Sequence, residues 1–289
     1  MKLIDNNNSK HTRFSVKSFN RRQWAGFFVV LGSLFLVILA LVGSFMPEQS
    51  YAIDYNHKYA APSLSYLFGT DELGRDMFYR TLKGLALSIK IGLMAAFVSS
   101  CIALVLGTLS AVFGGKVDSC ILWLIDLCLG IPHIILILMI SVSLGGGEIG
   151  VTIGVIATHW AHLTRLMRAE IMQLRNQPYV HVARGYGHSY FTIGRKHFIP
   201  HVLPQYIIGL VLLLPHAILH EAGITFLGYG LPLDVPAIGI ILSESMKHIS
   251  IGMWWLGFFP GLLLMIIVLI FDRVGTALRE ILDPMRSQK

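Results

Sequence analysis

Long apolar intervals free of Asp, Glu, Lys and Arg recur along the chain, separated by segments that carry the charges. An α-helix needs roughly 20 apolar residues to cross about 30 Å of hydrocarbon. Six intervals reach or approach that length: 23–47, 91–115, 127–147, 149–164, 197–220 and 248–271. The pattern therefore predicts an all-α, polytopic membrane protein with six transmembrane helices. The fourth interval is the shortest, so its helix must be tilted or extended through flanking residues.

Composition agrees with this prediction and excludes several other classes of protein. Hydrophobic residues make up 54% of the 289 residues and charged residues only 13%, and the mean hydropathy is +0.66. A soluble enzyme or a disordered chain of this length would carry more charge. We therefore expect a multi-pass protein in a lipid bilayer and no nucleic-acid partner, although the net charge is +7.

The basic residues predict the orientation. Most of the 23 Lys and Arg lie before the first interval, between the fourth and fifth, and after the sixth. Cytoplasmic segments of membrane proteins are enriched in Lys and Arg, which predicts that both termini are cytoplasmic. The layout is then a cytoplasmic N-terminal segment, a first transmembrane helix, an extracytoplasmic loop, a five-helix core and a cytoplasmic tail, at 1–22, 23–47, 48–82, 83–275 and 276–289.

The cytoplasmic link 165–200 within the core is about twice the usual length of a connection, which indicates a function of its own. Pro178 is placed to start a helix. Apolar residues then follow at i, i+3, i+4 and i+7, with His181 and Arg184 on the polar faces: Tyr179, Val182, Ala183 and Tyr186. Such a helix either lies in the headgroup layer or inserts its apolar face into a groove on a partner protein, and the pattern allows both.

The chain contains 12 histidines, and four of them form two pairs inside predicted spans. His159 and His162 are three residues apart and His216 and His220 four apart, so each pair lies on one helix face. Imidazole commonly binds nickel, zinc, copper or cobalt, and polar side chains inside a span are costly. We interpret His216 and His220, with the adjacent Glu221, as candidates for the substrate path. The alternative is solvated or helix-bridging imidazoles, and no permanent metal is expected because a path must release what it holds.

The sequence lacks the residues that several kinds of chemistry require. No phosphate-binding loop is present, so we expect this chain to bind no cofactor and to leave ATP and Mg to other subunits. Acidic residues inside the spans are few, which makes an ion-coupled secondary transporter the weaker interpretation. An intramembrane metalloenzyme is also disfavoured, because His220 and Glu221 do not belong to an HExxH motif. The chain is therefore predicted to transport rather than to catalyse.

Three motifs in the sequence resemble motifs of a known protein family. Residues 179–189 (YVHVARGYGHS) and 197–204 (HFIPHVLP) resemble the cytoplasmic EAA loop of binding-protein-dependent ABC importer permeases. Residues 68–76 (FGTDELGRD) resemble the signature after the first span in permeases of the dipeptide, oligopeptide and nickel family. The third match is 221–230 (EAGITFLGYG), with 259–261 (FPG) and 282–284 (LDP) near the end. The resemblance covers about residues 21–284 and implies a type I ABC importer transmembrane domain, with the ABC type-1 core at 83–275.

The resemblance also implies partners and site residues. The partners are a homologous permease, two ATP-binding subunits and an extracytoplasmic solute-binding protein, in a bacterial cell membrane. By resemblance, the residues that couple to the ATPase are His181, Val182, Ala183, Arg184, Gly187, His197 and Pro200. The extracytoplasmic signature comprises Gly69, Thr70, Asp71, Gly74, Arg75 and Asp76. His181 stands where the family has Glu, and Val182 where it has the second Ala, so the ion pair that the family's Glu makes is not expected in this chain.

The expected substrate is a small solute. Among the solutes that the family transports, the high histidine content favours one that contains a metal. Within that family the chain looks most like permeases for nickel or for metal bound to an opine-type chelator, including staphylopine-type importers. We therefore expect a metal chelate of nickel, cobalt or zinc. The alternative is a dipeptide or oligopeptide, which would suit the same cavity because both solutes are small and zwitterionic.

Overall fold

A computed structural model describes residues 21–282, and these form helices and loops with no β-strand. The all-α prediction is thus confirmed for the described residues. Most of the predicted cytoplasmic segment 1–22 and the end of the tail 276–289 lie outside them, as do residues 283 and 284 of the last motif. Within 21–282 the order is α1 (Arg21–Phe45), η1 (Glu48–Tyr51), η2 (Tyr55–His57), α2 (Met77–Phe113), α3 (Gly115–Gly130), α4 (His133–Ser143), α5 (Gly147–Arg175), α6 (Pro178–Gly185), α7 (Tyr190–Ile193), η3 (Gly194–Phe198), α8 (Ile199–Phe226), α9 (Ile238–Ile249) and α10 (Trp255–Leu282).

Four helical segments of the described chain are long and apolar enough to cross a bilayer: α1, α2, the run from α7 to α8, and α10. A fifth crossing is available if α3 and α4, which meet at an angle of 96°, count together. The predicted fourth span, 149–164, lies inside α5, which is long enough to cross a bilayer but less apolar than these four segments. The described residues therefore contain four or five segments that are apolar enough to cross a bilayer, whereas the sequence predicts six.

The largest departure from the predicted spans is the break in the third, 127–147. Pro132 has no N–H to donate and disfavours helical geometry at the residue before it. Ile131 accordingly adopts an extended conformation, with φ −97° and ψ 136°. The interval predicted as one rod is therefore the end of α3, a sharp bend and α4.

Other helix boundaries differ from the ends of the predicted intervals. A charged residue ends an uncharged interval, but it does not end the helix that contains it. The second interval, 91–115, is the inner part of α2, which begins at Met77 and includes Lys83 and Lys90. Lys83 donates to the backbone oxygen of Ser44, 3.1 Å away, and Lys90 pairs with Glu148 at 3.1 Å. The sixth interval, 248–271, starts seven residues before α10 begins at Trp255, because α9 and a turn occupy that stretch.

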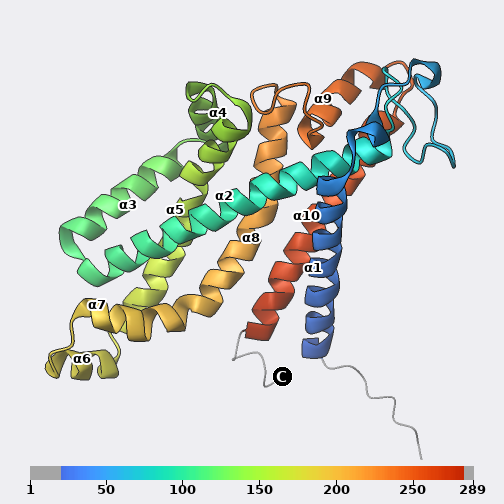
Figure 1. The fold of residues 1–289 in the computed structure, drawn as a ribbon. Coiled ribbons are helices and arrows are strands. Elements are labelled where there is room, and N and C mark those ends of the chain that lie inside the picture. Colours follow the sequence, from blue (N-terminus) through green and yellow to red (C-terminus); the bar gives the residue numbers. More distant parts are fainter. Residues whose placement is uncertain (1–20, 283–289) are drawn as a thin grey trace, which may run out of the picture.

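The helix α2 runs obliquely through the molecule and contacts α5, α8 and α1 (Figure 1). Its contact with α5 is close at Gly107, where an added Cβ would lie 3.0 Å from the backbone oxygen of Thr164. A larger residue would push the two helices apart. The buried side chains along this contact include Met167 and Ile171, which join the hydrophobic core around Phe198.

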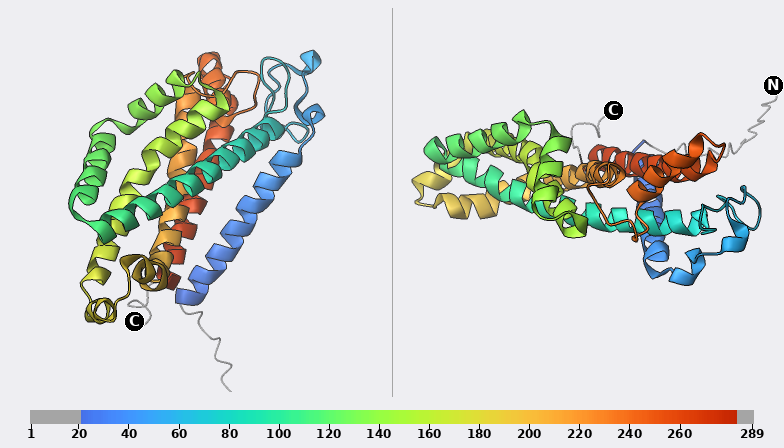
Figure 2. Two further views of the ribbon diagram at one scale, coloured as in Figure 1. Left: turned by 60° about the vertical axis from the view of Figure 1, so that its left-hand side comes forward. Right: turned by 90° about the horizontal axis from the view of Figure 1, so that it is seen from above.

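Two regions sit at opposite ends of the helices. The loop 46–76 and the short helix α9 lie at one end, and α6 with α7 lies at the other (Figure 1). Viewed from above, the molecule is elongated, with α1 and α10 toward one end and α3 to α5 toward the other (Figure 2). α1 and α10 contact each other and expose large apolar side chains, as expected for lipid-facing helices.

Candidate functional site

A cavity of about 730 Å³ opens between the α3–α4 bend, α5 and α8, and five histidines line it. His159 and His162 come from α5, His216 and His220 from α8, and His133 from the first turn of α4. Leucines supply most of the remaining wall. The structure thus brings both predicted histidine pairs to one cavity and adds a fifth imidazole that the sequence analysis missed.

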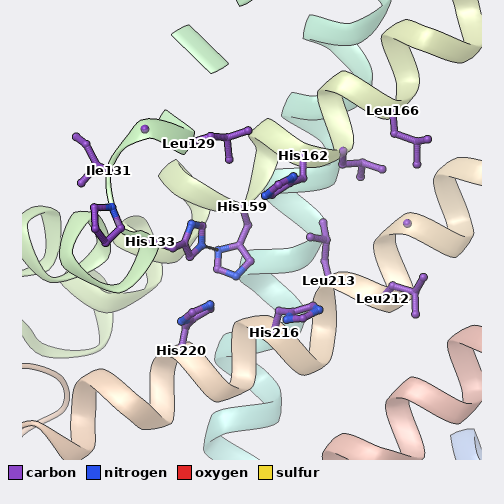
Figure 3. A pocket seen from close by; sticks show the side chains of 14 residues that line it. Leu129, Ile131, His133, His159, His162, Leu166, Leu212, Leu213, His216 and His220 are labelled. Carbon is purple, nitrogen blue, oxygen red and sulfur yellow. Dashed lines mark hydrogen bonds between the residues drawn. The ribbon is translucent and has the colours of Figure 1, made fainter. Parts of the chain in front are cut away.

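His133 was missed because its position depends on the break in the third span. A straight helix over 127–147 gives no reason to place His133 near the other histidines. The bend after Ile131 starts a new helix at His133 and turns its side chain toward α5 and α8 (Figure 3). The signal that would have found it is Pro132 directly before a histidine inside an apolar interval.

Three of the five imidazoles form a compact cluster, which we call the histidine cluster: His133, His159 and His220. Each contributes one ring nitrogen to a set lying within 4.8 Å of one another. The ring centroids of His133 and His159 are 4.7 Å apart, and that of His220 is 4.8 Å from His133. Figure 3 shows the three rings converging, with His162 and His216 farther along the cavity.

The hydrogen bonds of His159 leave one of its nitrogens free. His159 is only 5% exposed. Its Nδ1 lies 2.9 Å from the backbone oxygen of Val155, 3.2 Å from Thr158 Oγ1 and 3.3 Å from His133 Nε2. A carbonyl can only accept, so Nδ1 carries the proton and Nε2 carries a lone pair. Nε2 is buried and has no hydrogen-bond partner. The imidazole therefore presents an unsatisfied acceptor inside the protein.

Glu221, predicted beside His216 and His220, does not line the cavity. It is completely buried, its Oε1 accepts a 3.0 Å hydrogen bond from the hydroxyl of Thr225, and its Oε2 has no partner. Adjacent helix positions point in different directions, which separates Glu221 from His220.

The extracytoplasmic signature forms an ordered loop built around Asp71. The Asp71 carboxylate accepts from the backbone N–H of Leu73 and of Arg75, at 2.9 and 3.0 Å, and from Arg75 Nε at 2.6 Å. Arg80 donates to the same carboxylate at 3.1 Å. Glu244 of α9 lies 2.7 Å from Arg80, which ties the loop to the segment before the last helix.

The rest of the signature shapes the turns and starts α2. Gly69 and Gly74 have φ values of +70° and +75°, a region that favours glycine. The hydroxyl of Thr70 donates to the backbone oxygen of His57, and the side chain of Asp76 accepts from the N–H of Phe78 at 2.8 Å as an N-cap. Burial raises the pKa of the Asp76 carboxyl. All six predicted residues therefore belong to one structured loop.

At the opposite end, α6 begins at Pro178, as the sequence predicts, and ends in a Schellman motif centred on Gly187. The N–H of His188 donates to Ala183 O at 3.1 Å, and the N–H of Gly187 donates to Arg184 O at 2.9 Å. Gly187 has φ +85°, and a Cβ there would meet no other atom within 4 Å. Glycine is therefore required by backbone conformation rather than by space.

The predicted apolar stripe of α6 points largely away from the protein. Val180 is buried and Ala183 partly so, whereas Tyr179, Val182 and Tyr186 are exposed. Tyr186 is 83% exposed. These three residues form what we call the α6 apolar face.

The other predicted coupling residues divide between the surface and internal contacts. His181 is exposed. Arg184 lies over the Tyr190 ring, 4.0 Å from its centroid, so it braces the turn between α6 and α7. His197 and Pro200 help to line a second cavity of about 670 Å³, between the end of α5, the start of α6, η3 and the start of α8.

Comparison with known proteins identifies the family. Residues 103–285 match the family described as the binding-protein-dependent transport system inner membrane component. The chain belongs to this family. Its ABC importer permease relatives include the dipeptide permease DppC of Bacillus subtilis, 30% identical over 92% of this chain and 82% of the relative. OppC, the oligopeptide permease of the same organism, is 31% identical over 88% and 85%.

Two further proteins resemble the chain. The probable D,D-dipeptide permease DdpC of Escherichia coli is 29% identical over 90% of this chain and 88% of the relative. A solved structure of the MetNI methionine ABC transporter, in inward facing conformations, is 20% identical with a TM-score of 0.49, over 70% of this chain and 97% of that one. The permease is thus a membrane component and not an enzyme, and ATP hydrolysis takes place on separate subunits of such importers.

Proposed function

We propose that this permease forms half of the translocation path of an ATP-driven importer for dipeptides or oligopeptides in a bacterial cell membrane. The observation that carries the substrate class is the similarity, over most of the chain, to permeases named for dipeptide and oligopeptide transport. These names favour the peptide alternative over the metal chelate that the histidine content first suggested.

The proposed topology has six crossings, with α5 as the crossing that lacks sufficient hydropathy. α5 spans 29 residues, enough for a bilayer at 1.5 Å per residue. Its polar side chains at Thr152, Thr158 and Thr164 are buried, so they meet protein rather than lipid. With α3 and α4 as one broken crossing, both termini fall on the side of α6. That side carries Arg165, Arg168 and the other basic residues of the cytoplasmic link.

The α6 apolar face is the proposed docking point for an ATP-binding subunit. An exposed apolar stripe on a short helix at the cytoplasmic end suits insertion into a groove on a partner. The Schellman motif at Gly187 and the Arg184–Tyr190 contact hold α6 at a fixed angle to α7. α7 leads through η3 directly into α8, so a displacement of α6 is passed to a helix that lines the histidine-bearing cavity.

The proposed cycle assigns the work to several partners. A solute-binding protein delivers the peptide to the outer end, where the Asp71 loop and α9 present a fixed surface. ATP binding closes the two ATPase subunits, moves α6 and its counterpart in the second permease, and opens the path outward. Hydrolysis and product release reset it. Neither an ion gradient nor chemistry on this chain takes part in the cycle.

Uptake by cells tests the substrate class. The gene is removed from its host, and uptake of a radiolabelled dipeptide is compared with that of the host carrying a plasmid copy. We expect deletion to lower ATP-dependent uptake and the plasmid copy to restore it, with no change for a labelled monosaccharide as the control solute. Unchanged uptake of dipeptides and oligopeptides in a host without other peptide importers would contradict the proposal.

A further inference from the structure

The histidine cluster is chemically unlike the rest of the cavity that contains it. Leucines and other apolar side chains form most of the wall, whereas His133, His159 and His220 bring three imidazoles together. Passage of a peptide gives no reason for three imidazoles to converge on one point. A polar cluster in an apolar wall is costly unless something satisfies it.

The orientation of His159 matches that of a metal-binding histidine. Such residues commonly donate one ring N–H to a carbonyl or carboxylate and use the other nitrogen as the ligand. His159 Nδ1 lies 2.9 Å from Val155 O, and the opposite nitrogen, Nε2, is buried without a partner. The hydrogen bond therefore fixes the tautomer and points a lone pair into the protein interior.

The other two members of the cluster complete a set of three nitrogen donors. His133 and His220 are each partly exposed to the cavity, so their rings have room to reorient. Bonds of about 2.0–2.1 Å to a tetrahedral ion require nitrogens roughly 3.4 Å apart. One ring nitrogen of each residue lies within 4.8 Å of the others, and His133 Nε2 lies 3.3 Å from His159 Nδ1. Coordination through His159 Nε2 therefore requires the His133 ring to turn toward that nitrogen.

From these contacts we infer that His133, His159 and His220 form a binding site for a divalent transition-metal ion such as Ni²⁺, Zn²⁺ or Co²⁺. Three imidazoles suit these ions and leave coordination positions open for another molecule. This inference goes beyond the proposed function, because it assigns the permease a metal site of its own, whichever solute passes through the cavity.

The charge of the site predicts what accompanies the ion. Among the described residues that line the cavity, none is acidic, so three neutral imidazoles would hold two positive charges inside the membrane domain. An uncompensated dication there is strongly unfavourable. A carboxylate and an amine from a small chelating molecule would fill the open positions and lower the net charge. The metal is therefore expected to be held more tightly with such a chelator than alone.

Metal binding to the purified chain tests the site without any transport. The full-length permease is produced without a polyhistidine tag and equilibrated by dialysis with Ni²⁺, Zn²⁺ or Co²⁺, with and without glycine as the carboxylate and amine donor. We expect about one ion per chain by elemental analysis, a visible Co²⁺ spectrum of nitrogen coordination, and tighter binding when glycine is present. Failure to bind any of the three ions would overturn the inference.

Variants locate the ion. His133→Asn, His159→Asn and His220→Asn should each weaken binding by at least about tenfold, since even the loss of a supporting residue around a metal costs about 10–100-fold. His188→Asn, on the exposed turn after α6, is the matched control and should bind as the unaltered protein does. His220→Cys should restore much of the affinity lost in His220→Asn, because a thiolate also binds these ions.

The outcomes separate this inference from the proposed function. Equal metal binding by the three Asn variants and the unaltered chain would overturn the site, provided that size-exclusion profiles show intact folding. Dipeptide uptake that remains normal while metal binding is absent would overturn the inference and leave the peptide importer standing. Loss of dipeptide uptake on deletion, with bound metal demonstrated, supports both.

Discussion

The guanidinium of Arg80, on α2, lies 2.7 Å from the carboxylate of Glu244, on α9, and 3.1 Å from that of Asp71. Arg80 is almost fully buried, so its charge depends on these two partners. One side chain thereby connects the outer loop, the start of α2 and the segment before α10. The loop 46–76 is therefore held against α2 and α9 by ion pairs.

The two carboxylates should not contribute equally to stability. Asp71→Asn removes the negative charge and one of the two oxygens that accept from two guanidinium groups and two backbone N–H groups, and it should lower the free energy of unfolding by about 3 kcal/mol. Glu244→Gln leaves Arg80 paired with Asp71 and should cost only about 1 kcal/mol. Thermal unfolding in detergent measures both. A larger loss for Glu244→Gln would show that α9, and not Asp71, holds the loop.

Two Arg–Asp pairs that both connect α3 and α5 provide an internal comparison. Arg168 contacts Asp118 through two nitrogens, at 2.6 and 2.7 Å, with both side chains 19% exposed. Arg165 contacts Asp126 through one nitrogen at 2.7 Å, with side chains 50% and 68% exposed. Bidentate, shielded pairs are worth more than exposed ones.

Removal of either carboxylate tests that difference. Asp118→Asn should destabilise the protein by about 2 kcal/mol, and Asp126→Asn by less than about 1 kcal/mol. Raising the salt concentration should remove most of the smaller effect and little of the larger one. Chemical unfolding at low and high salt measures this, and equal costs for the two variants would refute the ranking.

Asp76 should respond to pH in a direction set by its burial. The pKa of its carboxyl is raised by burial, so the charged form is the costly one in the folded protein. Asp76→Asn keeps an N-cap of similar strength without that charge and should be at least as stable at neutral pH, whereas Asp76→Ala should lose about 1 kcal/mol.

The pH dependence has a definite sign. A raised folded-state pKa means that protonation favours the folded protein, so stability relative to Asp76→Asn is greatest below the unfolded pKa of Asp. It then falls as pH rises through the folded pKa. Unfolding curves from pH 3 to pH 7 measure the difference. An unaltered protein that gains stability relative to Asp76→Asn as pH rises would contradict the assignment to burial.

Local signals in the sequence predicted the start of α6. Pro178 marks that start, because the effect of a proline at the first helical position acts within a few residues. The same holds for the pairing of His216 with His220 on one face. The sequence could not place His133, since its neighbours come from α5 and α8 through a bend of the chain. Whether α5 crosses the bilayer is hard to predict for a related reason. Its polar residues are buried against other helices, and the hydropathy of a sequence contains no information on such tertiary contacts.

Gly187 should control coupling rather than folding. A β-branched residue is strained at φ +85°, so Gly187→Val should distort the turn after α6 and uncouple ATP hydrolysis from uptake while the protein still inserts into the membrane. Gly185→Ala is the matched control, because Gly185 lies in the helix with open space around its Cβ position. ATPase activity and dipeptide uptake are measured together in proteoliposomes. Normal uptake by Gly187→Val would remove the coupling role of this turn.

The central claim is that this permease supplies a passage and receives its driving force through α6 from separate ATPase subunits. The most direct measurement compares labelled dipeptide accumulation in proteoliposomes that hold the permease alone with those that hold the complex co-purified in mild detergent. Both are supplied with ATP, binding protein and an imposed proton gradient. We predict accumulation only by the complex and only with hydrolysable ATP. Accumulation against a gradient by vesicles that contain this chain alone would contradict the account.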